Sequence, residues 1–143
     1  MKKLSLEGLK FIATEIDITN NIMTITLNRP EKKNALNNVM MNEINYALAY
    51  AKQEKSVRVV VFAAEGDIFC AGADLGRLIP LISGSRSAED EWDERMLADR
   101  TILETALLRE FDPIKPVIAA INGHAIAGGM EIVQGTDIRV SVP

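Results

Sequence analysis

The sequence predicts an α/β domain in which the order strand, strand, helix recurs. Residues 57–63 and 117–121 are near-continuous apolar runs, which are typical of strands covered on both faces by flanking helices. Residues 37–53 carry apolar side chains at helical spacing instead. The chain has 143 residues, of which 48% are hydrophobic. This length and apolar content match one globular domain with its own core.

A β-hairpin is predicted for residues 11–28, closed at Asn20-Asn21, because asparagine tolerates the positive φ angles that a two-residue turn requires. The expected register gathers the apolar side chains on one face and leaves Glu15 and Asp17 on the other. Its pairs are Ile18 with Met23, Ile16 with Ile25, and Thr14 with Leu27. Residues 29–33 then form a polar loop.

An amphipathic helix follows over about residues 37–53, buried on one side. Its apolar stripe consists of Leu36, Val39, Met40, Ile44, Ala47, Leu48 and Ala51. After the strand at 57–63 and a turn at Gly66-Asp67 comes a segment of small residues, 69–75, in which Asp74 is expected at or near the start of a short helix.

Residues 83–87 are the most loop-like stretch of the chain. Ser87 is a plausible helix start because acidic residues follow it, and an apolar stripe from Trp92 to Leu107 predicts one long helix. Pro113 and Pro116 end that region. A buried strand at 117–121 leads through Asn122-Gly123 into a second small-residue segment, with a helix beginning near Gly129, and a last buried-type strand is expected over 137–142.

Composition excludes several classes of protein. The net charge of −4 and the pI near 5.1 argue against nucleic-acid binding, which needs a basic surface; the small cluster Arg29, Lys32 and Lys33 is the exception. A single cysteine, Cys70, excludes an internal disulfide. No run reaches transmembrane length, and Ser5 breaks the apolar stretch that a signal peptide would need. We therefore expect a soluble cytoplasmic protein that binds neither nucleic acid nor membranes.

The two small-residue segments, 69–75 and 122–131, carry the main functional signal. Each can present a bare backbone N–H to a ligand, and together they suggest an oxyanion hole for a carbonyl substrate. Gly128, just ahead of a helix, is a candidate donor. The alternative is an ordinary strand-to-helix turn. Neither a dinucleotide fingerprint nor a phosphate-binding loop is present.

Four further residues have a chemical and a structural interpretation. Glu131 is the best candidate for a general acid or base, with a pKa raised by desolvation among apolar neighbours; the alternative is a first-turn glutamate that complements the helix dipole. Asp74 is better explained as a cap than as a catalyst. His124, the only histidine, more often serves neither proton transfer nor metal binding, and Cys70 lacks an indicated histidine partner and fits a small buried residue.

Taken together, these residues resemble the crotonase superfamily of enoyl-CoA hydratases and isomerases. The resemblance covers nearly the whole chain, with four matches in the right order. The matching segments are Asn28-Arg29-Pro30 with Asn34-Ala35-Leu36, Cys70-Ala71-Gly72-Ala73-Asp74-Leu75, Lys115 to Glu131, and Asp137-Ile138-Arg139.

The resemblance implies a crotonase fold, a spiral of β-β-α units. It also implies an acyl-CoA thioester as substrate, with coenzyme A as part of that substrate and no metal or redox cofactor. The oxyanion hole would be formed by the N–H groups of Ala73 and Gly128, and Glu131 aligns with one catalytic glutamate. The implied coenzyme A contacts are Ala71, Asp74, Leu75 and Gly76 along the pantetheine channel, and Lys33 and Ala35 toward the nucleotide.

One departure concerns the second hydratase glutamate, which would lie past Pro143, as would the helices that complete the pocket. We therefore expect residues 1–143 to be the N-terminal portion of a crotonase-like protein without an internal boundary, a homotrimer or hexamer when full length. The expected activity is 2-enoyl-CoA hydration. The alternatives are Δ3-Δ2-enoyl-CoA isomerisation or another crotonase-family reaction, and an inactive fragment that binds coenzyme A or serves assembly.

Overall fold

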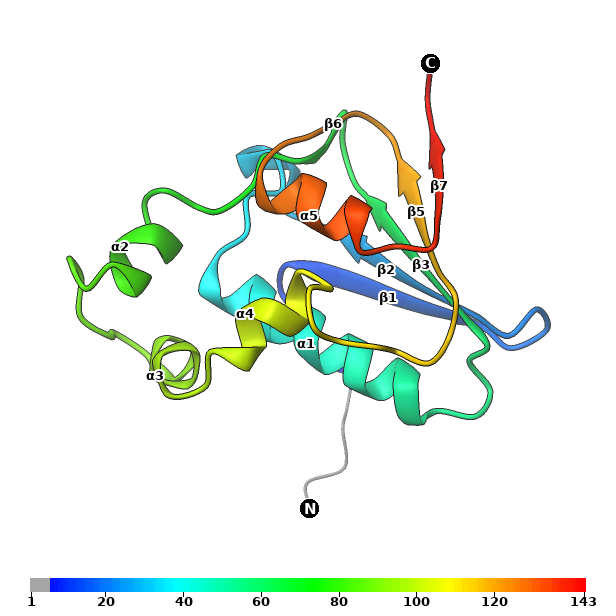
Figure 1. Ribbon diagram of the computed structural model, residues 1–143, viewed down its shortest axis with the longest axis horizontal. Coiled ribbons are helices and arrows are strands. Elements are labelled where there is room, and N and C mark those ends of the chain that lie inside the picture. The colour runs from blue at the N-terminus through cyan, green and yellow to red at the C-terminus, as the bar shows by residue number, and fades with distance from the viewer. Residues whose placement is uncertain (1–5) are drawn as a thin grey trace.

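Strands and helices alternate along the chain, as the sequence predicts (Figure 1). The computed structural model describes residues 6–143; the signal-peptide argument at Ser5 lies outside the described residues. The strands are β1 (Ile12–Asp17), β2 (Ile22–Leu27), β3 (Val59–Ala64), β4 (Ile68–Cys70), β5 (Val117–Ile121), β6 (His124–Ala125) and β7 (Ile138–Ser141). The helices are α1 (Asn38–Gln53), α2 (Leu78–Ile82), α3 (Glu91–Ala98), α4 (Thr101–Ala106) and α5 (Gly128–Gln134), with a 3-10 turn at Pro30–Lys32.

The strands form two sheets. The larger has five strands in the order β1-β2-β3-β5-β7, in which β1 and β2 are antiparallel and the other neighbours are parallel. The smaller pairs β4 with β6 in parallel. Because parallel strands end at the same edge of a sheet, the segments that follow β4 and β6 emerge side by side.

The predicted hairpin exists, but its predicted register is wrong by two residues. The structure pairs Ile16 with Met23, where the sequence predicted Ile25 as the partner. The turn is longer than two residues because the Asp17 carboxylate accepts hydrogen bonds from the backbone and side-chain amides of Asn20, at 3.1 and 2.7 Å. Ile18 is consequently 76% exposed. A shift of two residues keeps every side chain on its predicted face.

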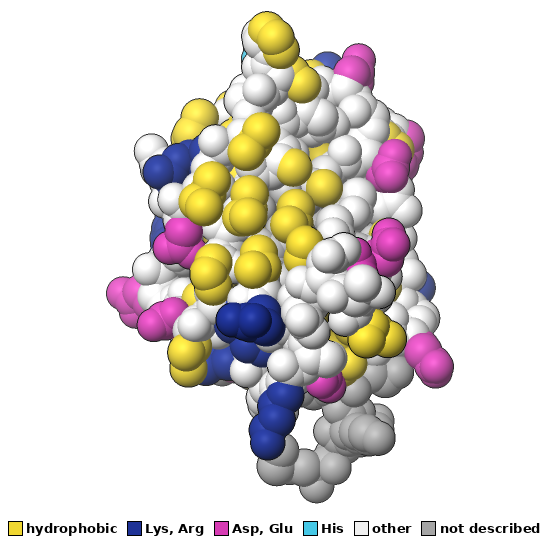
Figure 2. All heavy atoms as spheres, turned by 90° about the vertical axis from the view of Figure 1, so that its right-hand side faces the viewer, with side chains coloured by type: hydrophobic (Ala, Val, Ile, Leu, Met, Phe, Trp, Pro, Cys, Tyr) yellow, Lys and Arg dark blue, Asp and Glu magenta, His cyan; other side chains and the backbone are white. Residues whose placement is uncertain are grey.

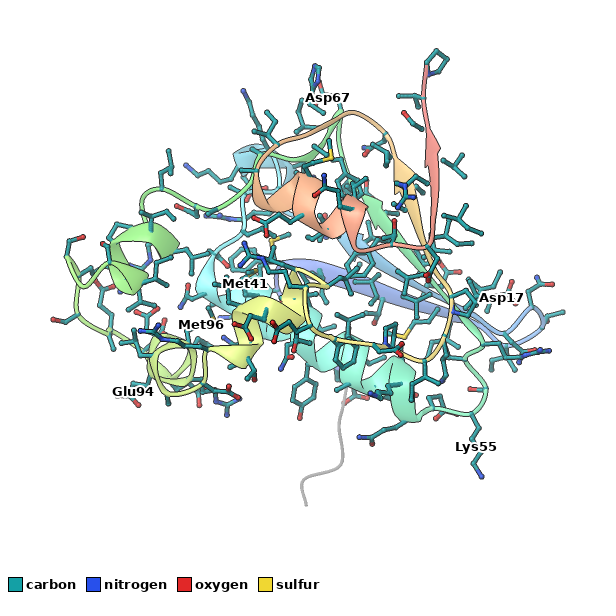
Figure 3. All side chains as sticks on the ribbon, in the orientation of Figure 1. Asp17, Met41, Lys55, Asp67, Glu94 and Met96 are labelled. Carbon is teal, nitrogen blue, oxygen red and sulfur yellow. The ribbon has the colours of Figure 1, made fainter. Side chains whose placement is uncertain are left out.

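Helix α1 follows the sequence prediction closely. Asn37 caps its first turn, with Oδ1 accepting a hydrogen bond from the Met40 N–H at 2.8 Å. The apolar stripe then faces the core, where Met41 is completely buried and Met96 of α3 nearly so; both are labelled in Figure 3. The helix therefore packs on one face of the large sheet, against β1 and β2.

The prediction that β3 and β5 are covered on both sides is wrong for the other face of the large sheet. Along β3, Val60 and Phe62 are fully buried, whereas Val59 and Val61 are only partly buried. Strand β7, predicted as a buried strand, is exposed along its whole length. Figure 2, which views the side that carries β7, shows hydrophobic side chains gathered there. Among residues 6–143, helices therefore cover only one face.

The long helix predicted from Ser87 onward is two helices. Asp90, rather than Ser87, caps α3, because its Oδ1 accepts hydrogen bonds from the next turn at 3.0 and 2.8 Å. Asp99 then takes an extended conformation, and its carboxylate bonds the backbone and hydroxyl of Thr101, at 3.0 and 2.6 Å. Such local side-chain bonds compete with the helix ladder, so the chain restarts as α4.

Candidate active site

The two small-residue segments meet because β4 and β6 are parallel partners. Cys70 pairs with Ala125 at the ends of these strands. Immediately beyond them, the Ile126 N–H donates to the Cys70 carbonyl at 2.9 Å. The segments that the sequence could only identify separately therefore lie against one another.

Gly72 and Gly128 lie close together where the two segments meet. Gly72 has φ 95°, and a Cβ added there would lie 2.9 Å from the Ile126 oxygen and 3.5 Å from the Gly128 nitrogen. A Cβ on Gly128 would in turn lie 3.8 Å from the Gly72 Cα. Only glycine permits both this φ and this approach. The residue after Gly72 is Ala73, so both proposed amide donors sit at this contact.

Both amides are free to donate. Within residues 6–143, no hydrogen bond uses the N–H of Ala73 or of Gly128. Ala73 is bridged to Leu36 in parallel fashion, through Leu36 N–H to the Gly72 oxygen and Asp74 N–H to the Leu36 oxygen, each 2.8 Å. In such a bridge the N–H of the central residue points away from its partner. The Ala73 N–H is thus directed away from Leu36.

The backbone at Ala127 is strained, which the sequence did not indicate. Ala127 has φ 48° and ψ −117°, a region that residues with a Cβ rarely adopt. A backbone of this kind costs about 1–3 kcal/mol and persists where the surroundings over-determine it. The turn that precedes Gly128 is therefore held by its neighbours, and strain of this sort clusters at functional sites.

Glu131 does not have the apolar surroundings that the sequence suggested. Its side chain is 33% exposed, and its Oε2 lies 2.5 Å from Arg109 Nε. Hydrogen bonding to Glu131 raises the pKa of Arg109. The other carboxylate oxygen, Oε1, accepts no hydrogen bond from residues 6–143. The partner Arg109 was missed because it follows α4, 22 residues from Glu131, and belongs to no motif.

The predicted coenzyme A contacts divide into two groups. Lys33 and Ala71 lie together, because the Ala71 N–H donates to the Lys33 oxygen at 3.0 Å. Ala35 follows two residues after Lys33 on the same segment. Leu75, 80% exposed, and Gly76 face solvent. Asp74 does not, since its side chain is only 13% exposed and pairs with Arg29.

Arg29 is also not the solvated loop residue that the basic cluster suggested. Its residue exposure is 8%, and Nη1 donates to Asp74 Oδ2 at 2.6 Å and to the Ala35 oxygen at 3.0 Å. Lys32 and Lys33 remain exposed. Asp74 itself caps the turn before α2, as expected, with Oδ1 accepting from the amides of Gly76 and Arg77 at 2.9 and 3.0 Å.

Two other candidates contribute no reactive side chain to this arrangement. His124 is exposed on β6. Cys70 is fully buried, and burial raises the pKa of its thiol to about 11, so the thiolate needed for a nucleophile is scarce at neutral pH. In the described chain, no group of three or more His, Cys, Asp or Glu side chains is placed to hold a metal ion.

A hollow of about 450 Å³ lies elsewhere, between α1 and α3, lined in part by Val39, Tyr46, Trp92 and Arg95. It contains neither of the two small-residue segments. We place the candidate site at these segments, because their free amides and close backbone approach carry chemistry that the hollow lacks.

The strand order, the small second sheet and the paired turns define a crotonase-type α/β fold, and solved structures agree. An enoyl-CoA hydratase from Bacillus anthracis superposes with a TM-score of 0.72 at 30% identity, over 92% of this chain and 47% of that one. A hydratase/isomerase from Legionella pneumophila gives 0.74 at 30% identity, over 94% and 48%.

Sequence comparison leads to the family. The sequence model described as enoyl-CoA hydratase/isomerase matches residues 17–142, and the chain belongs to that family. It is 36% identical over 125 residues to a probable enoyl-CoA hydratase of Mycobacterium leprae, and 34% identical over 122 residues to a mitochondrial dienoyl-CoA isomerase of Mus musculus.

The chain spans less than half the length of these relatives. The matches cover 85% and 83% of this chain but only 44% and 37% of the two relatives. The activities of these relatives, as whole proteins, are therefore only proposed for this chain. No helix in residues 6–143 is both long and apolar enough to cross a membrane.

Proposed function

We propose that this chain forms the thioester-binding half of an acyl-CoA lyase or isomerase, with 2-enoyl-CoA hydration as its best-supported activity. The observation that supports the proposal is the close approach of Gly72 to Gly128, together with the unpaired amides of Ala73 and Gly128. Fixed donors of this kind stabilise an oxyanion without reorganising, and one such donor is worth about 3–4 kcal/mol.

In this proposal the amides of Ala73 and Gly128 bind the thioester carbonyl oxygen. Addition of water to the β-carbon of the enoyl group moves charge onto that oxygen, and the resulting thioester enolate is the species that the two N–H groups stabilise. Coenzyme A, including its nucleotide, is part of the proposed substrate. The proposed reaction uses no metal or redox cofactor.

Glu131 is proposed as the group that moves the proton. It lies in α5, three residues beyond Gly128, and its Oε1 is free to accept a proton from water while Oε2 stays with Arg109. A positioned acid or base contributes about 10²–10⁴ in rate. Ala71, Leu75 and Gly76, with Lys33 and Ala35, are proposed to line the path of the coenzyme A arm.

The test is the hydration of crotonyl-CoA, followed by the loss of absorbance of the conjugated thioester, with the wild-type chain and Glu131→Gln. We expect the variant to bind the thioester but to lose at least 10²-fold in rate. The matched control is Glu104→Gln, a carboxylate on neighbouring α4, which should hydrate at the wild-type rate. Equal rates for wild type and Glu131→Gln would remove Glu131 from the mechanism.

Two alternatives have specific support. The similarity to a dienoyl-CoA isomerase favours double-bond isomerisation, which needs the same oxyanion donors and one proton carrier; incubation with 3-hexenoyl-CoA would then yield the 2-enoyl product. The unpaired amides of Ala73 and Gly128 would equally serve a module that binds coenzyme A thioesters, or supports assembly, without turnover. Calorimetric titration with 3-hexenoyl-CoA, followed by analysis of the thioester recovered, separates these, because a module binds the thioester and returns it unchanged. Assembly as a cytoplasmic homotrimer or hexamer remains part of the proposal.

A further inference from the structure

The segment that carries the Ala73 amide belongs to neither sheet. Residues 71–74 run parallel to residues 33–36 and are held to them by three backbone hydrogen bonds. Ala71 N–H donates to the Lys33 oxygen at 3.0 Å, and the Gly72 oxygen and the Asp74 N–H bond Leu36 at 2.8 Å each. Because these bonds flank Ala73, the direction of its free N–H depends on where residues 33–36 lie.

Residues 33–36 are in turn fixed by a buried asparagine. Asn34 is completely buried; its Oδ1 accepts from the Arg29 N–H at 2.8 Å, and its Nδ2 donates to the Glu65 and Ile68 oxygens at 2.9 Å each. Lys33 and Asn34 both have positive φ, 52° and 55°. Such a conformation persists only when surrounding contacts hold it.

One guanidinium group then joins the two segments. Arg29 Nη1 donates to the Ala35 oxygen on one segment, at 3.0 Å, and to Asp74 Oδ2 on the other, at 2.6 Å. The Arg29 and Asp74 side chains are only 10% and 13% exposed. The guanidinium also lies 5.3 Å from the centroid of the Phe11 ring, an arrangement that restrains it further.

The Asp74 carboxylate is fully engaged within the protein. Its second oxygen accepts hydrogen bonds from the Gly76 and Arg77 amides, so both carboxylate oxygens are hydrogen-bonded to protein groups. Burial by itself would raise the pKa of Asp74, but the hydrogen bonds from Arg29 and from the two amides hold it below the ordinary value. The side chain is thus an anion at neutral pH that faces Arg29 and not a ligand.

We propose that Arg29 and Asp74 are positioning residues that hold the Ala73 N–H toward Gly128, and that they act on a bound thioester only through that amide. This inference rests on the proposed oxyanion hole. It replaces the coenzyme A contact that the family resemblance implies for Asp74. Weakening the pair should therefore reduce polarisation of the thioester carbonyl while leaving affinity for the coenzyme A part almost unchanged.

The test uses 2,4-hexadienoyl-CoA, whose absorbance band moves to longer wavelength when its carbonyl is polarised. We expect wild type to shift the band, and Asp74→Asn and Arg29→Lys to lose more than half of that shift with a Kd within threefold of wild type. The matched control is Arg77→Gln, which removes the neighbouring exposed ion pair to Glu89 and should keep the full shift. A purely structural role would change the Kd and the shift together.

A second measurement needs no ligand and guards against misfolding. Amide hydrogen exchange in Asp74→Asn should accelerate at least tenfold at Leu36 and Asp74, while the buried Val60 and Phe62 of β3 keep wild-type protection. A wild-type band shift that persists in both variants, or unchanged exchange at Leu36 and Asp74, would overturn the inference alone. A wild-type chain that produces no shift would overturn the proposed function, and this inference with it.

Discussion

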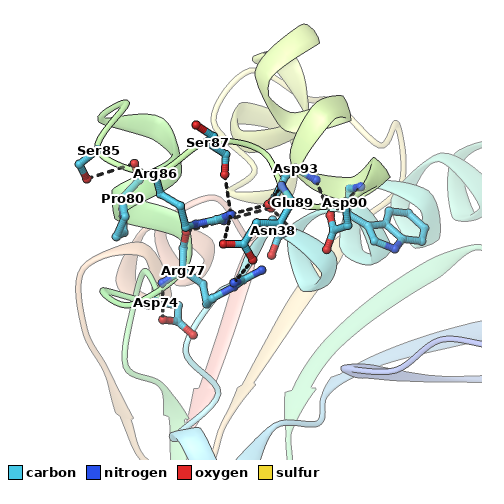
Figure 4. A network of polar contacts seen from close by, with 11 residues as sticks. Asn38, Asp74, Arg77, Pro80, Ser85, Arg86, Ser87, Glu89, Asp90 and Asp93 are labelled. Carbon is cyan, nitrogen blue, oxygen red and sulfur yellow. Dashed lines mark hydrogen bonds and ion pairs between the residues drawn. The ribbon is translucent and has the colours of Figure 1, made fainter.

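The Asp93 carboxylate is completely buried and lies 2.5 Å from Arg86 Nη1. It accepts further hydrogen bonds from the Asn38 side chain and from the Glu89 N–H (Figure 4). Asn38 opens α1, Arg86 belongs to the loop after α2, and Asp93 lies in α3. One buried anion thus joins the start of α1, the loop and α3, beside the turn that Asp74 caps.

The first prediction is that Asp93→Asn lowers stability by about 3–5 kcal/mol, because Arg86 is left without its anion and the new amide meets donors on two sides. Urea unfolding at pH 7 measures this. The matched control is Asp90→Asn, which retains an N-cap side chain and should stay within about 0.5 kcal/mol of wild type.

The same pair predicts a pH dependence. Hydrogen bonding to Arg86 lowers the pKa of Asp93 in the folded chain, so its contribution is fully present above the unfolded value, about 3.9. It is lost as the pH falls below that value and through the folded pKa. The unfolding free energy of Asp93→Asn should therefore fall less steeply between pH 5 and pH 3. Parallel curves for the two proteins would contradict this account.

A second prediction concerns Gly129. A Cβ at this position would lie 2.5 Å from the Cys70 oxygen and 2.7 Å from the Cys70 Cβ, and the backbone of β4 cannot move away without disturbing the site. Gly129→Ala should cost about 3 kcal/mol. Gly76→Ala is the matched control, because its nearest contact would be 3.4 Å away; thermal unfolding should separate the two variants by several degrees.

A third prediction is that Ala127→Gly raises stability by about 1 kcal/mol. Glycine relieves the strain of φ 48°, worth about 1–3 kcal/mol, and this exceeds the added entropy of the unfolded chain, about 0.4–1 kcal/mol. The control Ala125→Gly, in strand β6 without positive φ, should instead lose about 0.5–1 kcal/mol. Destabilisation by both substitutions to a similar extent would show that the strain is not stored at Ala127.

A fourth prediction uses Cys70, the only cysteine. Because burial raises the pKa of its thiol to about 11, it should react with an aromatic disulfide reagent at pH 8 only when the chain opens. The rate in the folded protein should be at least 10²-fold below the rate in concentrated urea. Rapid modification of the folded chain would mean that the sheet formed by β4 and β6 opens readily.

Sequence patterns located the elements well where neighbouring residues decide the structure. The stripe of α1 and the strand at 117–121 both depend on residues close in the chain, and the structure confirms them. The failures have local causes of another kind. Asp17 bonds Asn20 and lengthens the hairpin turn, and Asp99 bonds Thr101 and divides the predicted long helix.

For the candidate site, too, sequence patterns found the residues within motifs but not their partners from distant parts of the chain. Family resemblance and glycine spacing selected Ala73, Gly128 and Glu131, but neither could place the partner Arg109, which comes from another element. Nor could they indicate that the Asp74 side chain points inward, because its partner Arg29 lies 45 residues earlier. Distant charges leave no periodic trace in a sequence.

The sequence by itself determined which segments become strands and helices, which side of each is apolar, and which turns need glycine, because each of these follows from a few adjacent residues. The hairpin register escaped the pattern because a shift of two residues preserves the faces, and only the tertiary structure decided which distant segments meet. It alone brought Gly72 against Gly128, through the parallel pairing of β4 and β6. Contacts between distant segments depend on how the whole chain packs, and no local pattern specifies them.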